Sequence, residues 1–79
     1  MPDAPKKLQP IPDIKKVLGG QVKKLRAESG LSQEALSDMC NIFRTYLSRI
    51  ESGDANPTVT FLAALAAGLN VDIRDLFGD

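Results

Sequence analysis

Residues 30–53 read GLSQEALSDMCNIFRTYLSRIESG, and this stretch decides the fold. Ser32 stands at the position of a helix N-cap, and the residues after it predict a short helix over 33–39. Cys40-Asn41-Ile42 predicts a tight break, because asparagine tolerates the left-handed backbone conformation almost as well as glycine does. A second helix is predicted over 44–51. Two short helices joined by so short a turn predict a helix-turn-helix.

Another helix is predicted ahead of this pair, after Asp13, whose side chain could cap its first turn. Apolar residues recur there at helical spacing, and lysines cover the other faces. The adjacent Gly19 and Gly20 favour a start or a bend of this helix near them, since each costs about 1 kcal/mol relative to alanine. Gly30 supplies the C-terminal stop.

Two more helices are predicted behind the pair. Thr58 caps one that Gly68 closes, and Asp72 caps a last short one. With no convincing strand candidate, the expected fold class is all-α, a compact domain of five helices over residues 13–79. Residues 1–12 hold four prolines and two lysines and predict a flexible N-terminal tail, either a solvated arm or a basic arm that touches DNA.

The composition excludes most enzyme chemistry. The chain has 79 residues, and ten basic side chains offset ten acidic ones, so the formal net charge is zero. Histidine is absent, which excludes imidazole bases, Ser–His and Cys–His pairs and histidine metal ligands. The carboxylates show no metal-loop spacing, and the glycine pair lacks the flanks of a phosphate loop. We therefore expect no enzyme, no cofactor and no metal site.

Cysteine use and hydropathy bear on location. Cys40 is the single cysteine, so no internal disulfide can form, and a cytoplasmic protein is expected. Cys40 fits a buried, inert thiol; the alternative, a redox sensor, requires exposure and a lowered pKa. No stretch approaches the roughly 18 consecutive apolar residues of a membrane span, so no membrane partner is expected.

Residue identities are more specific than this geometry. The strings LSQEAL over 31–36, RTYLSRIESG over 44–53 and NPT over 56–58 resemble the Cro/repressor-type (XRE) helix-turn-helix family. The chain looks most like the small controller proteins of restriction–modification systems, and phage-type repressors are a near match. The resemblance implies a lambda-repressor-like domain of five helices that binds double-stranded DNA as a homodimeric, autoregulatory transcriptional regulator.

The resemblance places a recognition helix, at about 44–51, in the major groove. Arginine can donate a forked pair of hydrogen bonds to guanine, and short hydroxyl side chains reach bases or phosphate. The alternative is an ordinary solvated face with two surface arginines. The candidate base-reading residues are Arg44, Thr45, Ser48 and Arg49.

The resemblance also implies contacts to the DNA backbone. Gln33 matches a residue that commonly contacts phosphate beside the amides of a helix N-terminus, although it also suits a solvated first turn. Phe43 stands where the family usually has a capping Ser or Thr, so that cap is lost or shifted, and its ring could contact a thymine methyl group. The candidate backbone contacts are Gln33, Phe43, Tyr46 and Asn56.

Arg26 and Glu51 match positions that often form a partly buried ion pair in this family; Arg26 as a phosphate contact is the alternative. A domain this small makes too few contacts for selective binding alone, so a dimer on a palindromic operator is expected, with half-sites about 34 Å apart. The candidate dimer surface comprises Leu69, Val71, Ile73 and Phe77, which could instead complete the monomer core.

The neutral total conceals an uneven distribution of charge. Residues 1–51 hold nine basic and six acidic side chains (net +3), whereas residues 52–79 hold one and four (net −3). The basic part contains the helices expected to face DNA. An acidic surface could contact RNA polymerase, which is a further candidate partner. The alternative function is a protein–protein adaptor or antitoxin-like module built on the same fold.

Overall fold

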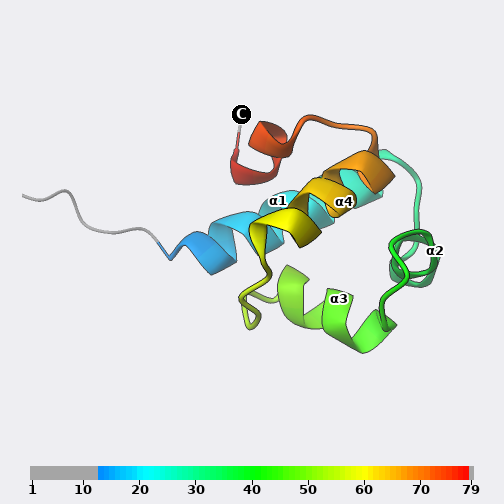
Figure 1. Cartoon of the computed structure of the whole chain (residues 1–79), viewed down its shortest axis with the longest axis horizontal. Helices are drawn as coiled ribbons and strands as arrows, with labels where there is room; N and C mark the ends of the chain where they lie inside the picture. The colour runs from blue at the N-terminus through cyan, green and yellow to red at the C-terminus, as the bar shows by residue number, and fades with distance from the viewer. Residues whose placement is uncertain (1–12, 79) are drawn as a thin grey trace, which may run out of the picture.

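The structure of the protein is a computed structural model, which describes residues 13–78. The tail predicted over 1–12 lies outside the described residues. Figure 1 shows its helices in chain order. The elements are α1 (Ile14–Glu28), α2 (Gln33–Met39), α3 (Arg44–Glu51), α4 (Val59–Leu69) and the 3-10 helix η1 (Ile73–Phe77). The prediction of an all-α fold is confirmed, and none of these helices is long and apolar enough to cross a membrane.

The prediction of five α-helices is wrong, because the last element is a 3-10 helix of five residues. Asp72 caps its start as predicted, and Asp75 completes a capping box there. Gly78, with φ 125°, leaves the helical region directly after its end. A segment this short, fixed at both ends, suits the tighter 3-10 geometry, which proteins use in short pieces.

The helix-turn-helix has the predicted bounds, and its local signals act as expected. The Ser32 hydroxyl accepts a hydrogen bond from the Ala35 backbone N–H at 3.0 Å and caps α2. Asn41 adopts the left-handed conformation, with φ 56°, and turns the chain toward α3. Phe43 occupies the N-cap of α3, and no side chain makes a capping bond there, so of the two predicted alternatives this cap is lost.

α1 runs unbroken from Ile14 to Glu28 through its two glycines, so it does not start at them, which was one of the two predicted alternatives. Gly19 is the point of closest approach between α1 and the end of α3. A Cβ atom built there would clash with the Ile50 carbonyl and lie 2.7 Å from the Glu51 carbonyl oxygen. The same atom built on Gly20 would meet nothing within 4 Å. Only the first glycine is therefore required by packing.

α4 ends one residue later than predicted. Gly68 lies inside the helix, and Asn70, with φ 57°, forms the left-handed C-cap. A Cβ atom built on Gly68 would lie 3.1 Å from Cys40 Sγ, so the glycine lets α4 pack closely against the end of α2. The glycine that looked like a stop signal serves packing instead.

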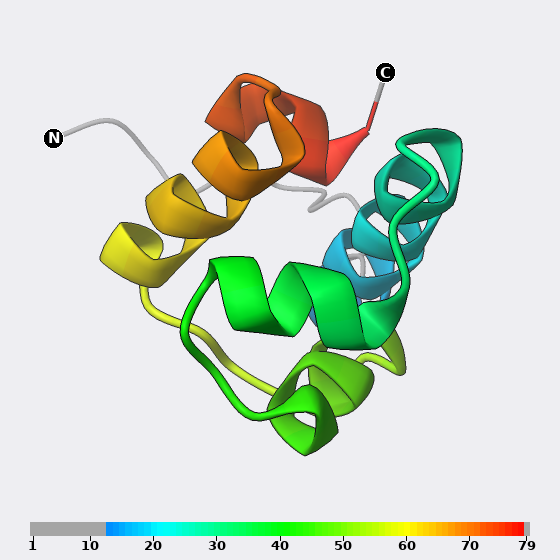
Figure 2. The same cartoon turned by 90° about the vertical axis from the view of Figure 1, so that its right-hand side faces the viewer.

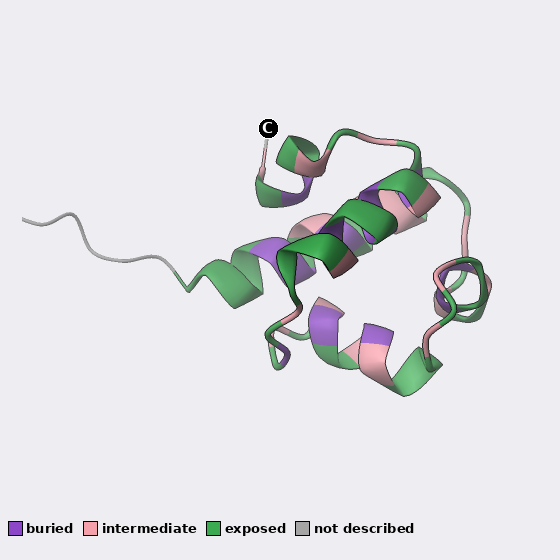
Figure 3. Cartoon of the chain, viewed as in Figure 1, coloured by how far each residue is buried: buried purple, intermediate pink, exposed green. Residues whose placement is uncertain are grey.

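The core is aliphatic and lies between the helices, whose buried segments face one another in Figure 3. Figures 1 and 2 show α3 at the edge of the molecule that lies opposite η1, while α1 and α4 pack between these two ends. Among residues 13–78, this arrangement leaves one long face of α3 uncovered. The buried members of the core are Leu18, Val22, Leu36, Leu47, Ile50, Ala55, Leu62, Leu65, Ala66, Leu69 and Leu76.

The contact between α1 and α3 can be tested with the two neighbouring glycines. Gly19→Ala should lower the free energy of unfolding by about 1–3 kcal/mol, because the new methyl group meets backbone atoms that cannot move aside. Gly20→Ala is the matched control and should raise it by up to about 1 kcal/mol, since it only removes backbone freedom from the unfolded chain. Urea unfolding followed by circular dichroism measures both. Equal effects of the two substitutions would contradict the packing described.

Candidate nucleic-acid interface

A buried ion pair fixes α3 against α1. Arg26 Nε lies 2.6 Å from Glu51 Oε2, and its Nη2 donates to Glu51 Oε1 at 3.0 Å. Arg26 Nη1 donates to the backbone carbonyl of Leu31 at 2.9 Å, so the same guanidinium also holds the connection between α1 and α2. The side chains of Arg26 and Glu51 are 15% and 4% exposed. Arg26 and Glu51 thus join α1, the connection between α1 and α2, and the end of α3.

The electrostatics of the pair keep Arg26 charged. The hydrogen bond to Glu51 raises the pKa of the Arg26 guanidinium, and the negative charge of Glu51 adds to the rise, while partial burial opposes it. Each of the three nitrogens of this guanidinium donates to an oxygen of the protein, so the group is held at its place in the fold. The structure thus contains the predicted ion pair between Arg26 and Glu51.

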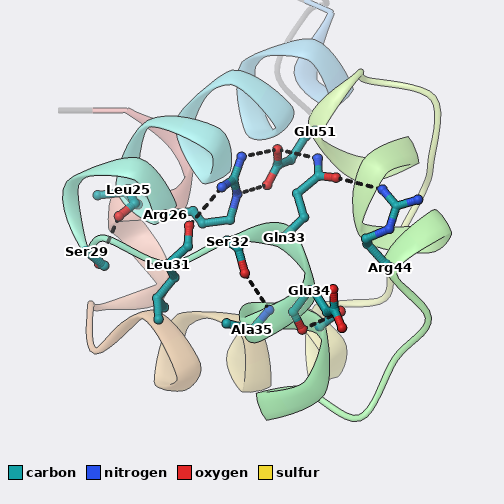
Figure 4. Close-up of polar contacts among 11 residues, drawn as sticks. Leu25, Arg26, Ser29, Leu31, Ser32, Gln33, Glu34, Ala35, Arg44 and Glu51 are labelled. Carbon is teal, nitrogen blue, oxygen red and sulfur yellow. Dashed lines mark hydrogen bonds and ion pairs between the residues drawn. The ribbon is translucent and has the colours of Figure 1, made fainter.

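Gln33 lies between this ion pair and the exposed start of α3, as Figure 4 shows. Its Nε2 donates to Glu51 Oε1 at 2.9 Å, and its Oε1 accepts from Arg44 Nη1 at 3.3 Å. The sequence singled out each of these residues and missed their contact. Gln33 and Glu51 are 18 positions apart, and no local pattern reports how α2 is set against α3.

The four candidate base-reading residues lie on one face of α3. At about 100° per residue, Arg44, Ser48 and the other two span roughly 140° of the helix circumference. Ser48 is half-buried and the others are exposed, whereas Leu47 and Ile50 on the opposite side are 0% and 1% exposed. The face is therefore polar, accessible and carried by a helix that the core holds in place.

Arg49 folds back onto the loop that follows α3. Its Nη2 donates to the Asp54 carbonyl at 3.0 Å, and its Nε lies 3.9 Å from the Asp54 carboxylate. Both side chains are more than half exposed, and exposed pairs of this kind contribute little free energy. The guanidinium can thus leave Asp54 for another acceptor at small cost.

The candidate backbone contacts occupy different environments. Phe43 is 83% exposed at the start of α3, and Asn56 is exposed in the connection to α4. The ring of Tyr46 packs edge-on against Phe61, with the centroids 5.7 Å apart, and its side chain is half-buried. Phe43 has a large exposed apolar side chain at the α3 edge of the molecule. Because it directly precedes Arg44, it borders the face of α3 that carries Arg44.

The candidate dimer surface needs one correction. Leu69 is 4% exposed and belongs to the core of the single chain, because α4 packs its last turn inward. Val71 and Ile73 pack partly against that core, and Phe77 is 42% exposed. Phe77 thus offers the most free apolar surface of the four.

Cys40 lies at the end of α2 and is partly buried. Burial raises the pKa of its thiol, since desolvation disfavours the thiolate. This is the opposite of the lowered pKa that a redox sensor requires. Among residues 13–78, no cluster of His, Cys, Asp and Glu is arranged to hold a metal ion.

Similar proteins agree with this geometry. The Helix-turn-helix family (HTH_3) matches residues 22–76. The control protein C.MunI of a Mycoplasma species is 41% identical over 68 residues, which cover 85% of this chain and 92% of that protein. The crystal structure of the restriction–modification controller protein C.AhdI from Aeromonas hydrophila matches with a TM-score of 0.77 and 32% identity, over 80% of this chain and 96% of that one.

A third similar structure includes nucleic acid. The crystal structure of SinR, a master regulator for biofilm formation, in complex with DNA has a TM-score of 0.72 and 32% identity. The match covers 77% of this chain and 98% of that one.

The ion pair should contribute strongly to stability. Glu51→Ala should lower the free energy of unfolding by about 3 kcal/mol, because it leaves a mostly buried guanidinium without its carboxylate. Glu28→Ala removes an exposed carboxylate at the end of α1 and serves as the control, with an expected change within about 0.5 kcal/mol. Thermal unfolding followed by circular dichroism compares them. An unchanged melting temperature for Glu51→Ala would contradict the proposed importance of the pair.

The raised pKa of the Cys40 thiol predicts that it reacts slowly with disulfide reagents. At about pH 8, a disulfide reagent such as dithionitrobenzoate should modify the folded protein about tenfold more slowly than the urea-unfolded chain. The rate for the folded protein should rise with pH as the thiolate forms in the alkaline range. A folded-state rate equal to or above that of the unfolded chain would indicate an accessible, activated thiol instead.

Proposed function

Because the chain belongs to the helix-turn-helix family of DNA-binding transcriptional regulators, which are not enzymes, we propose that it binds a palindromic operator as a homodimer and regulates its own gene. In this proposal a domain over residues 13–79 inserts α3 of each copy into the major groove. The observation that carries it is the exposed polar face of α3 opposite a fully buried one. Such a protein works in the cytoplasm, beside the DNA it regulates.

The base-reading face comprises Arg44, Thr45, Ser48 and Arg49. The backbone-contacting residues are Gln33, Phe43, Tyr46 and Asn56, which lie on or beside the two helices of the motif. Arginine side chains donate forks that match guanine, and hydroxyl and amide groups match phosphate oxygens. Gln33 donates a hydrogen bond to the Glu51 side chain and Arg49 donates one to the Asp54 backbone carbonyl, so DNA would replace some of these partners with its own acceptors.

The distribution of charge supports the orientation of the complex. Within the described residues, 13–51 carry seven basic and five acidic side chains, whereas 52–78 carry Arg74 against Asp54, Asp72 and Asp75. η1, which contains Asp75 and Arg74 and is capped by Asp72, lies at the end of the molecule opposite α3, whereas Asp54 lies beside Arg49 of α3. In this proposal the η1 end, with Asp72 and Asp75 against Arg74, carries a small net negative charge, points away from DNA and is available to RNA polymerase.

A second copy supplies the other half of the binding energy. One domain makes few contacts, so two copies joined by a two-fold axis would read two half-sites about 34 Å apart. Phe77, Val71 and Ile73 offer apolar area at one end of the chain that a second copy could cover. The similarity to control proteins favours regulation of a restriction–modification operon, including the chain's own gene.

The direct test is an electrophoretic mobility shift on the DNA upstream of the chain's own gene. The wild-type protein should form a complex of two copies, and Arg44→Ala or Arg49→Ala should each weaken it by about 1–3 kcal/mol and relax base preference at one position per half-site. Circular dichroism should report an unchanged fold for both variants, because both side chains are exposed.

Arg74→Ala is the matched control, since it removes an exposed arginine from η1, where it pairs with Asp72 at 3.0 Å. It should leave the base preference of the protein unchanged, because η1 lies away from the α3 face that is proposed to read bases. Failure of the wild-type protein to bind any duplex at low salt would favour the adaptor or antitoxin-like alternative. If either α3 variant bound all sequences as the wild type does, the assignment of the base-reading residues would be wrong.

A further inference from the structure

An open hollow lies at the turn between α2 and α3, and Figure 1 shows where these two helices meet. The residues that line the hollow are Asp38, Asn41, Ile42 and Phe43. The backbone around it is held by hydrogen bonds. Ile42 N–H donates to the Ser37 carbonyl at 3.0 Å, and the Phe43 carbonyl accepts from the Tyr46 N–H at 3.0 Å. The hollow is therefore carried on a fixed support, directly beside the face of α3 that is proposed to read bases.

Phe43 stabilises neither the start of α3 nor the core. It occupies the N-cap, a position that favours short polar side chains because they accept a hydrogen bond from the first turn. Phe43 makes no such bond and is 83% exposed. Positions at which a sequence breaks a local rule of this kind are expected to be functional sites. The exposed ring is therefore a candidate for contact with DNA.

The side chains of the hollow suit the edge of a base better than a phosphate. A phenyl ring has no hydrogen-bond donor for a phosphate oxygen, and the Asp38 carboxylate would repel a phosphate. That carboxylate is exposed and has no hydrogen-bond or ion-pair partner in the part of the chain that the structure describes. It can thus accept from a donor outside the chain. The contact to the DNA backbone proposed above for Phe43 can come from its main chain, while its ring faces a base.

Few bases present an apolar group in the major groove. Thymine has a C5-methyl group there, which phenylalanine can contact, and 5-methylcytosine carries a methyl group on the same ring atom. The two bases differ at the neighbouring position, where thymine presents the acceptor O4 and cytosine presents an N4 amino donor. A carboxylate accepts from the amino group and repels O4. A hollow that combines a ring with a carboxylate therefore favours 5-methylcytosine over thymine.

We infer that the hollow at the α2–α3 turn binds the major-groove edge of a 5-methylcytosine. The ring of Phe43 contacts the methyl group, and the Asp38 carboxylate accepts from the N4 amino group. Binding then depends on methylation of the DNA as well as on its sequence. This inference rests on the proposed function, in which α3 enters the major groove.

Base analogues that differ by a single group test the inference. The full-length protein first selects duplexes from two random-sequence pools, one unmodified and one with 5-methylcytosine in place of cytosine. In the selected duplex, each pyrimidine is then changed in turn to cytosine, 5-methylcytosine, thymine and uracil, with the matching purine opposite. Fluorescence anisotropy measures the affinity for each duplex. Because uracil lacks only the methyl group of thymine, the effect of the methyl group is measured in two base contexts.

One pyrimidine in each half-site should show the effect. At that position 5-methylcytosine should bind about fourfold more tightly than cytosine, as expected for burial of one methyl group. Thymine should likewise bind about fourfold more tightly than uracil. Because the carboxylate accepts from N4 and repels O4, 5-methylcytosine should bind about fivefold or more tightly than thymine.

Two substitutions separate the ring from the carboxylate. Phe43→Ser should reduce both methyl effects to less than about 1.5-fold without lowering the melting temperature, since serine can cap α3. Asp38→Asn should keep the methyl effects and lose the preference for 5-methylcytosine over thymine, because an amide can also donate to O4. Ile14→Ser and Glu28→Gln remove an exposed apolar and an exposed acidic side chain from the two ends of α1 and serve as matched controls. Both should keep the base preference of the wild type.

Equal affinities for cytosine and 5-methylcytosine, and for uracil and thymine, at every pyrimidine would overturn the inference while leaving the proposed function intact. Methyl effects that persisted in Phe43→Ser would overturn the role of the ring. The role of the carboxylate would be overturned if the wild type bound thymine as tightly as 5-methylcytosine, or if Asp38→Asn kept the wild-type preference. If the wild type enriched no sequence from either pool, the proposed function would fail, and the inference with it.

Discussion

The carboxylate of Glu51 accepts hydrogen bonds from Arg26 on α1 and Gln33 on α2, although it belongs to the last residue of α3. Three helices therefore meet at one nearly buried charge, 4% exposed at the side chain. Removing a charge of this kind from water is favourable only when its partners satisfy it, so the three helices are constrained to approach in one arrangement. The position of α3 relative to the rest of the domain follows from that requirement.

The neighbouring backbone enforces the same arrangement by shape. Gly19 lets α1 come close to the carbonyls of Ile50 and Glu51, and Gly68 does the same for α4 beside Cys40. Leu47 and Ile50 fill the space beneath α3, and its outer face carries polar side chains. The polar face cannot rotate inward, because that rotation would expose Leu47 and Ile50 to water. Charge, close packing and apolar burial thus hold one polar helix face outward on a firm support, which is what reading of base edges requires.

The parts of the fold set by local chemistry could be predicted from the sequence. Ser32 caps α2, Asn41 turns the chain, and the bounds of both motif helices followed from such signals. The end of α4 could not be predicted, since Gly68 resembles a stop signal locally while it serves contact with a distant cysteine. Leu69 was misassigned for a related reason: an apolar side chain does not report whether its own chain or a second copy covers it. The link through Gln33 depends on helix packing, and the roles of the α3 residues toward DNA stay predictions.

The central claim is that the outward face of α3 is the surface that meets DNA. Nuclear magnetic resonance of the ¹⁵N-labelled protein, titrated with the duplex that it selects, tests this most directly through the backbone amide and arginine Nε–H signals. We expect the largest shifts at the first turns of α2 and α3 and at the Nε–H groups of Arg44 and Arg49, while η1 changes only through contact between copies. Shifts centred on α4 or on the lysines of α1, with the α3 arginines unmoved, would contradict it.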